Sequence, residues 1–401
     1  EEKSPSQLFI ERLEGIYVHV VIIAVLVMMF LPHLLFQWAL SESIYRALVL
    51  LVVASPCALV ASIAPATLSA ISNAARRGVL FKGGIHIENL AHIQAIALDK
   101  TGTLTKGKPE VTDVYIESNR FDEKDILRTV GGIEKESTHP LAKAISHYCI
   151  KNNKDITMDI QDWRNRSGEG ISAIISNVTW RIGKADFVGK EQAESFQDGV
   201  AHQLAEEGKT VVFVKAEDDI VAVFALKDTV RDSTKEAITQ LKQLGIRPVM
   251  LTGDNELTAK AIAKETGIKR YYANCLPENK VEHLNGIREK FGTVAMVGDG
   301  INDAPALATA SVGIAMGEGT GVALDTADMV LMKNDLSRII HSLQLSKRMN
   351  RIVKQNIIFS ISVIFLLIIS NYLQILDLPL GVLGHEGSTI LVILNGLRLL
   401  K

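Results

Sequence analysis

Residues 99–105 read Asp-Lys-Thr-Gly-Thr-Leu-Thr, and the short apolar run Ala-Ile-Ala-Leu at 95–98 directly precedes them. The apolar run predicts a buried strand, which places Asp99 at the carboxyl end of that strand. A carboxylate there can serve as a nucleophile, because a covalent acyl-phosphate splits one difficult phosphoryl transfer into two easier ones. Such a site needs Mg2+ to neutralise the phosphate charge that would otherwise repel the carboxylate. This stretch therefore predicts phosphoryl transfer through Asp99.

Two later stretches repeat the order of an apolar strand followed by polar residues. Residues 248–251 (Pro-Val-Met-Leu) precede Thr-Gly-Asp at 252–254, and residues 294–297 (Val-Ala-Met-Val) precede Gly-Asp-Gly-Ile-Asn-Asp at 298–303. Strands that alternate with helical stretches are typical of a parallel sheet with active residues at the carboxyl ends of its strands. We therefore expect these polar residues to lie near Asp99.

The 298–303 stretch supplies oxygen ligands beside glycines that let the backbone approach a charged ligand. We expect Asp299 to bind Mg2+ together with Asp99 and the backbone carbonyl of Thr101. Asn302 and Asp303 are expected to support this site.

Two further residues are suited to hold phosphate oxygens. Thr252 offers a hydroxyl, and Lys280, in the run Pro-Glu-Asn-Lys at 277–280, offers a point charge. We expect both to act in catalysis.

Four apolar segments are each long enough to span a bilayer, near residues 16–36, 47–66, 356–376 and 378–400. Basic residues flank the second and third segments on the side of the long middle segment: Arg76, Arg77, Lys82, Lys347, Arg348, Arg351 and Lys354. Because cytoplasmic flanks carry an excess of Lys and Arg, the middle segment is expected in the cytoplasm. The sequence predicts a multi-pass protein of the plasma membrane, with the lipid bilayer as a partner.

The predicted fold is mixed, with four transmembrane helices and cytoplasmic α/β domains. The expected divisions are a membrane helix pair with a cytoplasmic extension (1–92), a domain that carries Asp99 (93–107 and 227–335), an inserted domain (108–226) and a second membrane helix pair (336–401). The formal net charge of −2 gives no reason to expect a nucleic acid partner. Cys57, Cys149 and Cys275 do not suggest a disulfide framework, because the first lies in a membrane span.

The expected inserted domain contains residues suited to a purine nucleotide. His139 could stack on a base and Glu136 could accept a hydrogen bond from its exocyclic amine. Gly168 and Gly170 could bring the backbone close to the nucleotide. We predict that these four residues bind a purine nucleotide.

The run at 99–105, Thr-Gly-Asp at 252–254 and Gly-Asp-Gly-Ile-Asn-Asp at 298–303 resemble, in the same order, the motifs of P-type ATPases. The resemblance implies that residues 93–107 and 227–335 form a phosphorylation domain of the haloacid-dehalogenase type and that residues 108–226 form an inserted α+β nucleotide-binding domain. It also implies that ATP phosphorylates Asp99. Asp228 matches a family position near the hinge. The histidine-proline pair at 139–140 and the nearby glycines look like the motifs that hold ATP in heavy-metal P-type ATPases.

Two membrane segments carry possible ligands for a transported ion. In Ser55-Pro56-Cys57, proline releases a backbone carbonyl and cysteine offers a thiolate. The segment 385–389 reads His-Glu-Gly-Ser-Thr, and ionisable residues inside a membrane indicate function. We predict ligands at Ser55, Cys57, His385, Glu386 and Thr389.

These two motifs resemble the S-P-C and H-E-G-[GS]-T signatures of the heavy-metal subgroup associated with cobalt, zinc and ferrous iron. They differ from the C-P-C motif of copper and zinc/cadmium/lead pumps. Mixed sulfur, nitrogen and oxygen ligands suit borderline divalent ions better than Cu(I). The expected cofactors are ATP and Mg2+, and the expected cargo is Zn2+, Co2+ or Fe2+.

The T-G-E dephosphorylation loop of the family's actuator domain has no match here, and four helices are fewer than the family's usual set. We therefore expect a missing actuator domain and missing amino-terminal helices as partners of this chain. The alternatives are a membrane-tethered phosphatase of the haloacid-dehalogenase type and a non-catalytic metal-binding membrane protein.

Overall fold

The computed structural model describes residues 5–117, 120–152, 160–166 and 168–401. It divides into two compact units, one formed by residues 1–93 with 328–401 and the other by residues 94–327. We describe each unit separately.

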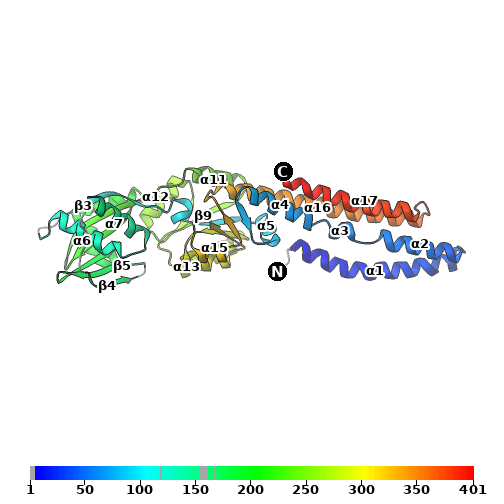
Figure 1. Ribbon diagram of the computed structural model, residues 1–401, viewed down its shortest axis with the longest axis horizontal. Coiled ribbons are helices and arrows are strands. Elements are labelled where there is room, and N and C mark those ends of the chain that lie inside the picture. Colours follow the sequence, from blue (N-terminus) through cyan, green and yellow to red (C-terminus); the bar gives the residue numbers. More distant parts are fainter. Residues whose placement is uncertain (1–4, 118–119, 153–159, 167) are drawn as a thin grey trace. The chain divides into compact units, whose positions relative to one another are not determined.

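The first unit is mainly helical (Figure 1). Its elements are α1 Pro5–Phe36, α2 Leu40–Val53, α3 Cys57–Val60, α4 Ala64–Arg76, β1 Val79–Phe81, α5 Gly84–Leu90, β13 Met329–Leu331, α16 Ser337–Tyr372, α17 Leu378–Leu397 and the 3-10 turn Arg398–Leu400. Among the residues that the structure describes, four stretches are long and apolar enough to cross a membrane: Ser6–Phe36, Leu40–Arg76, Ser337–Tyr372 and Leu378–Leu400. The four predicted membrane helices are therefore confirmed.

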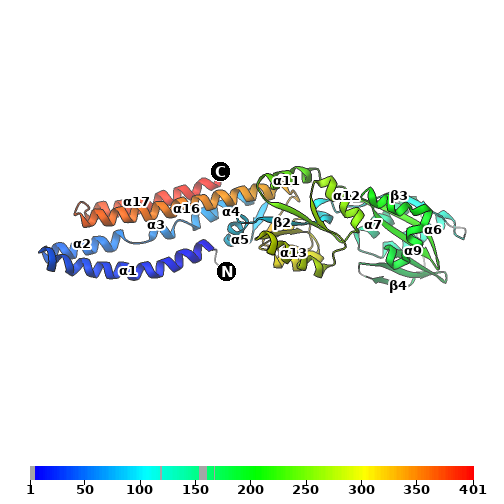
Figure 2. The ribbon, with the colours of Figure 1, turned by 180° about the vertical axis from the view of Figure 1, so that it is seen from behind.

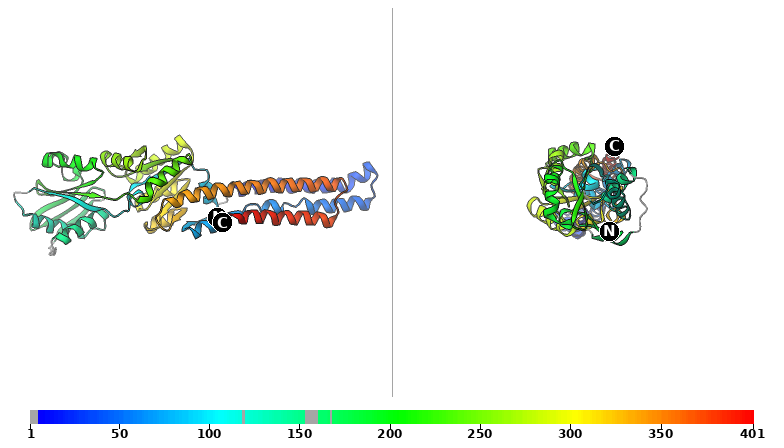
Figure 3. Two further views of the ribbon diagram at one scale, coloured as in Figure 1. Left: turned by 90° about the horizontal axis from the view of Figure 1, so that it is seen from above. Right: turned by 90° about the vertical axis from the view of Figure 1, so that its left-hand side faces the viewer.

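The second of these stretches is not one continuous helix. Pro56 lacks a backbone N–H and disfavours the helical conformation of Ser55, so α2 ends at Val53 and a new helix begins at Cys57. A second interruption separates α3 from α4 at residues 61–63. The long helices α16 and α17 run side by side, as the left view of Figure 3 shows in orange and red.

The second unit contains two sheets. Its elements are β2 Ala95–Asp99, β3 Glu110–Ile116, α6 Glu123–Lys135, α7 Pro140–Asn152, β4 Gln161–Arg166, β5 Gly170–Ile175, β6 Val178–Gly183, α8 Ala185–Val188, α9 Lys190–Ser195, α10 Val200–Glu206, β7 Thr210–Ala216, β8 Asp219–Lys227, α11 Asp232–Gln243, β9 Arg247–Leu251, α12 Glu256–Thr266, β10 Arg270–Tyr272, α13 Pro277–Phe291, β11 Val294–Gly298, α14 Ala304–Thr309, β12 Val312–Met316 and α15 Gly321–Thr326. Short one-turn segments at Lys100–Leu104, Phe196–Gly199 and Ile301–Asp303 complete the unit.

In the first sheet, strands β12, β11, β2, β9 and β10 lie in this order, each parallel to its neighbour. The four residues of β2 before Asp99 are fully buried, as a parallel strand covered on both faces requires. Figure 2 shows β2 with α11 and α13 around it. Because the strands are parallel, their carboxyl ends lie along one edge of the sheet, and the loops after β2, β9 and β11 meet there.

The second sheet is antiparallel and has the order β3-β8-β7-β6-β5-β4. Helices α6 and α7 cover one face through a core that includes Ile126, Ile145 and Trp180. Helices α8 to α10 cover the β7 and β8 part of the other face. This region is chain residues 110–227, inserted between β2 and the remaining strands of the parallel sheet.

The division into compact units falls after residues 93 and 327. Residues from 328 onward group with the helical unit because β13 pairs antiparallel with β1, which follows α4 directly. The expected domain bounds, with the phosphorylation domain extending to residue 335, stay a prediction.

Candidate functional site

The carboxyl end of β2, where Asp99 lies, is next to the carboxyl end of β11, because β2 and β11 are neighbouring parallel strands. Lys280, from the first turn of α13, lies between their carboxylates. Its Nζ is 2.6 Å from Asp99 Oδ1 and 2.6 Å from Asp303 Oδ1. All three side chains are buried. The structure thus joins residues separated by more than 180 positions into one charged cluster.

The electrostatics of this cluster are dominated by burial. Burial and, after it, the Asp303 carboxylate raise the pKa of Asp99, while Lys280 lowers it, and the net result is a pKa of about 6. Burial alone would lower the pKa of Lys280, but its two carboxylate partners outweigh burial and raise it. Burial, Asp99 and Asp303 together raise the pKa of Asp299 to about 7. The cluster therefore has three carboxyl groups, and the single positive charge of Lys280 cannot balance the negative charge of all three.

Asp299 approaches the turn that follows Asp99. Gly102 there has a φ of +68°, and a Cβ added to it would lie 1.6 Å from Asp299 Oδ2. Only glycine therefore fits at this position. Thr101 lies in the same turn and is exposed. Binding of Mg2+ by its backbone carbonyl stays a prediction.

Carboxylate oxygens of Asp99, Asp299 and Asp303 lie within 4.8 Å of one another. Within the described part of the chain, this is the one such group of three or more His, Cys, Asp or Glu side chains. Hard carboxylate oxygens with excess negative charge fit Mg2+. The residues present thus suit the metal that the sequence predicts.

The loop after β9 brings Thr252 to the same edge of the sheet. Thr252 is 2% exposed, and its Oγ1 accepts a hydrogen bond from the backbone N–H of Asp254 at 3.1 Å. The Asp254 carboxylate lies 2.5 Å from Lys100 Nζ. Burial would lower the pKa of Lys100, but Asp254, followed by Asp228 and Asp99, raises it. Our sequence reasoning gave no role to this buried pair, although both residues adjoin the predicted strand ends.

Arg231 is a further residue that sequence reasoning missed. Its Nη2 donates to the Gly102 carbonyl at 2.8 Å and its Nε to the Thr103 carbonyl at 3.2 Å. Nearby, the Thr105 hydroxyl donates to Asp228 Oδ2 at 2.5 Å. The guanidinium thus holds the turn that places Asp99 and Asp299. The available signal was its position three residues after Asp228.

The predicted nucleotide residues begin at the amino end of α7. His139 Nδ1 accepts a hydrogen bond from the backbone N–H of Leu141 at 3.2 Å. The other ring nitrogen, Nε2, takes no part in this hydrogen bond. Partial burial and the nearby Lys184 ammonium lower the pKa of His139. A neutral ring beside a lysine is suited to stack on a base while the lysine faces an anion.

Glu136 is exposed, whereas Glu134, two residues earlier on α6, is 3% exposed. Glu134 Oε2 has no hydrogen-bond partner within the described residues. Burial raises the pKa of Glu134 to about 8. Glu134 also lines a small pocket with Lys143, Ser146 and His147. The buried carboxyl of Glu134 is therefore a stronger candidate for a purine contact than Glu136, and sequence reasoning missed it.

The two predicted glycines have different surroundings. Gly168 has a φ of +79°, and an added Cβ would meet nothing within 4 Å. Gly170 pairs with Gly183 across β5 and β6, and an added Cβ would lie 2.4 Å from the Ile182 carbonyl oxygen. Gly170 is thus required by close strand packing, while Gly168 faces open space.

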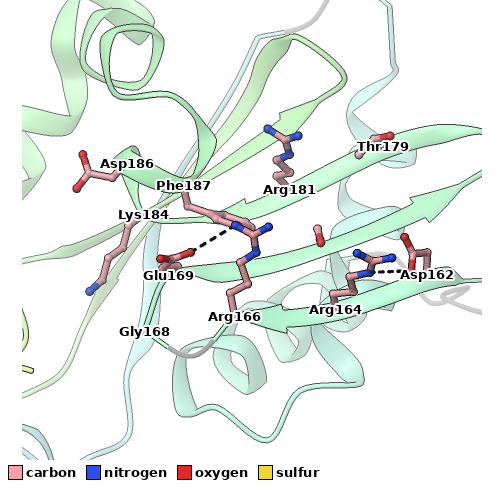
Figure 4. A pocket seen from close by; sticks show the side chains of 11 residues that line it. Asp162, Arg164, Arg166, Gly168, Glu169, Thr179, Arg181, Lys184, Asp186 and Phe187 are labelled. Atoms are coloured by element: carbon pink, nitrogen blue, oxygen red, sulfur yellow. Dashed lines mark hydrogen bonds and ion pairs between the residues drawn. The ribbon is translucent and has the colours of Figure 1, made fainter. Parts of the chain in front are cut away.

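Gly168 lines an open pocket of about 670 Å³ that residues of β4, β5, β6 and α8 form. Figure 4 shows the basic side chains that gather there, Arg164, Arg166, Arg181 and Lys184. Arg164 pairs with Asp162 at 2.8 Å, and Arg166 lies 3.8 Å from Glu169. The backbone N–H of Lys184 also donates to the Glu169 carbonyl, which ties this pocket to the glycine loop.

The predicted transport ligands lie in the helical unit. Ser55 Oγ and Cys57 Sγ are 3.0 Å apart at the break before α3. His385 is 3% exposed on α17, and its Nε2 lies 3.8 Å from Glu386 Oε1. Thr389 Oγ1 donates to the His385 carbonyl at 3.3 Å.

Cys57 and Glu386 are exposed within this unit. The described residues contain no group that joins Cys57, His385 and Glu386 within 4.8 Å. Helix α3 nevertheless packs against α17. A shared ligand set of these residues stays a prediction.

A parallel sheet that carries a buried aspartate, a lysine bridge and a carboxylate cluster at its strand ends defines a class of phosphoryl-transfer proteins that use an aspartate. A family model of haloacid dehalogenase-like hydrolases matches residues 93–311, more than half of the chain. Over 400 residues the chain is 54% identical to the zinc-transporting ATPase of Bacillus subtilis (strain 168), covering 99% of this chain and 62% of that protein.

Two solved structures are also similar to this chain. A crystal structure of a zinc-transporting PIB-type ATPase in the E2.Pi state matches with a TM-score of 0.77 at 39% identity, over 100% of this chain and 65% of that one. The catalytic domain of the CPx-ATPase CopB-B matches with a TM-score of 0.55 at 31% identity, over 68% of this chain and 96% of that one. The chain belongs to the haloacid dehalogenase-like hydrolase family and, within it, to the heavy-metal P-type ATPases. It spans about three fifths of the length of the zinc-transporting relative. It is a multi-pass membrane protein with cytoplasmic catalytic domains.

Proposed function

We propose that this chain contributes to ATP-driven export of a divalent transition metal through an aspartyl-phosphate at Asp99. The observation that carries the proposal is the buried Lys280 bridge between Asp99 and Asp303, with Asp299 beside it. In the first step an Asp99 oxygen forms a bond to the γ-phosphorus of ATP, the bond to the β,γ-bridging oxygen breaks, and ADP leaves. Water later cleaves the acyl-phosphate and releases phosphate.

Each residue of the cluster has a role in this proposal. Asp99, Asp299 and Asp303 hold Mg2+, which neutralises phosphate charge when bound. Lys280 and the Thr252 hydroxyl hold phosphate oxygens, and Arg231 keeps the loop after Asp99 in place.

The proposed nucleotide site lies on the inserted domain. His139 stacks on the adenine, and Glu134, rather than Glu136, faces the purine edge. Gly168 admits the nucleotide to the backbone, while Lys184 faces its phosphates. The lowered pKa of His139 next to Lys184 supports this arrangement.

Replacing the nucleophile tests the phosphorylation step. In the full-length pump, Asp99→Asn is expected to abolish acid-stable, hydroxylamine-sensitive labelling from γ-labelled ATP. Labelling that persists in Asp99→Asn at the wild-type level would refute the assignment. It would then favour phosphoryl chemistry at another residue.

For the transported ion we propose Zn2+ as the first candidate, because a relative and a structural neighbour are named as zinc transporters. Co2+ and Fe2+ remain part of the proposal through Ser55-Pro56-Cys57 and His385-Glu386. A thiolate, an imidazole and a carboxylate suit borderline divalent ions. The partners are the lipid bilayer, the metal ion, and an actuator domain with further helices.

Metal-dependent ATPase activity of the full-length protein across Zn2+, Co2+, Fe2+, Cd2+ and Cu+ tests the ion. Cys57→Ala, His385→Ala or Glu386→Ala should each remove stimulation by the divalent ions and leave ATP binding unchanged. Strong stimulation by Cu+, or stimulation that survives all three substitutions, would show that the assignment is wrong. A protein that hydrolyses simple phosphate esters without any metal stimulation would instead support the phosphatase alternative.

A further inference from the structure

A buried amide in the middle of α16 contacts two other segments of the helical unit. Asn356 is 2% exposed. Its Nδ2 donates to the carbonyl oxygens of Ser62 and Val392, each at 3.3 Å. Its Oδ1 accepts from Asn395 Nδ2 at 2.8 Å. One side chain therefore uses both its donors and its acceptor between helices.

The two carbonyls belong to the segments that carry the proposed metal ligands. Ser62 lies in the interruption between α3 and α4, five residues after Cys57. Val392 lies on α17, seven residues after His385, which is about two helical turns. Asn356 thus links the broken helix of Cys57 to the helix of His385.

Further contacts beside Asn356 also hold these segments close together. Ser62 Oγ donates to the Ala58 carbonyl at 2.8 Å and lies 3.4 Å from Ser360 Oγ, one turn along α16 from Asn356. At Gly396 on α17, an added Cβ would lie 3.0 Å from the backbone nitrogen of Ala66. Helix α17 therefore touches the backbone of α4 beside the amide. Water cannot replace these hydrogen bonds inside a bilayer, so they restrict how the segments move.

We infer that Asn356 is a positioning residue that sets the spacing between the Cys57 segment and the His385 helix, and thereby the metal selectivity of the transport site. The inference rests on the proposed function. An amide suits this task because it donates to two carbonyls and accepts from Asn395 while carrying no charge. A carboxylate of the same shape would place oxygens against both carbonyls and lose both donors.

Asn371 provides a matched control on the same helix. It is 1% exposed, and its Nδ2 donates to the Arg46 carbonyl at 2.9 Å. It lies 15 residues from Asn356, about 22 Å along the helix. Asn371→Ala removes a buried interhelical hydrogen bond without touching the segments of Cys57 or His385.

The experiment uses the full-length protein in lipid nanodiscs. Titration with Co2+ reports thiolate ligation by its charge-transfer absorption, and competition with Zn2+ gives the ratio of the two affinities. In Asn356→Ala and Asn356→Asp, the metal affinity is expected to fall and the Zn2+/Co2+ ratio to move toward one by roughly three- to tenfold. Asn395→Ala removes only the acceptor contact and should give a smaller shift in the same direction.

Phosphorylation by inorganic phosphate without metal should stay within about twofold of wild type in every variant, because the catalytic unit is unchanged. An unchanged Zn2+/Co2+ ratio in folded Asn356 and Asn395 variants would overturn the inference. An equal shift in Asn371→Ala would also overturn it, since general loosening of α16 would then explain the effect. Because metal binding is measured directly, a wild-type protein that binds Co2+ through Cys57 without metal-stimulated ATPase activity would count against the proposed function alone.

Discussion

The proposed phosphorylation centre and the proposed nucleotide-binding face lie in the same unit but organise their polar residues differently. At the phosphorylation centre, Lys280 lies 2.6 Å from two carboxylates, and all three groups are buried. On the inserted domain, His139 and Glu136 are exposed, and the buried Glu134 has an unpartnered oxygen. The phosphorylation centre thus pairs its charged groups with one another, whereas the proposed nucleotide residues include exposed side chains and one buried oxygen without a partner among the described residues.

The physical reason is the backbone that carries each set. Parallel strands bring their carboxyl ends to one edge whether or not a ligand is present, and burial then requires each charge to find a partner. A helix start and a glycine loop on an open sheet face impose no such requirement. Four expected results test this difference, from the largest effect to the smallest.

The first prediction removes the bridge at the phosphorylation centre. Lys280→Ala leaves two buried carboxylates without compensation, a change that costs about 3–5 kcal/mol in comparable buried pairs. Labelling from γ-labelled ATP should therefore fall by at least about a hundredfold. Lys290→Ala, an exposed lysine on the same helix, is the control and should label normally. Normal labelling of Lys280→Ala would mean that the bridge is not needed.

The second prediction compares two glycines that share a positive φ. Gly102→Ala should abolish phosphorylation, because its Cβ would lie 1.6 Å from Asp299 Oδ2. Gly168→Ala has open space around it and should cost only about 1–2 kcal/mol of backbone strain. Thermal unfolding and phosphoenzyme levels measure both. Equal effects of Gly102→Ala and Gly168→Ala would show that the two positions do not differ in packing as described here.

The third prediction concerns the arginine that holds the phosphorylation loop. Arg231→Lys keeps the charge but loses the paired hydrogen bonds to the carbonyls of Gly102 and Thr103. The phosphorylation rate should fall by roughly tenfold, with the KM for ATP nearly unchanged, because the nucleotide face is untouched. A change confined to KM would instead place Arg231 in nucleotide binding.

The fourth prediction uses the pH dependence of stability. Burial raises the pKa of Glu134 to about 8 from its ordinary value of 4.5, so the folded state binds more protons between these pH values. The free energy of unfolding should therefore fall as pH rises from about 4.5 to 8, by at most about 1.4 kcal/mol per pH unit. Glu134→Gln should flatten this dependence, while Glu136→Gln, at an exposed site, should not. Denaturant unfolding at several pH values measures the slopes, and parallel slopes for wild type and Glu134→Gln would exclude a buried, protonated Glu134.

The sequence by itself determined the membrane spans, the strand that ends at Asp99 and the order of the phosphate motifs. These features depend on local patterns, namely long apolar runs and short apolar strands followed by glycine and aspartate. The sequence likewise predicted that Pro56 releases a backbone carbonyl in the second span, since its missing N–H acts locally, whereas the end of α2 at Val53 and the new start at Cys57 came from the structure.

Only the tertiary structure decided which polar groups meet. The Lys280 bridge, the Lys100–Asp254 pair and the Arg231 contacts join segments far apart in the chain. The choice of Glu134 over Glu136 depended on how the end of α6 packs. Glu134 lies in the last turn of α6 and is buried, whereas Glu136 follows the last residue of α6 and is exposed. The link through Asn356 likewise depends on how three helices pack. A motif names the residues that can do chemistry, but packing decides their burial and partners, and these two factors control charge and position.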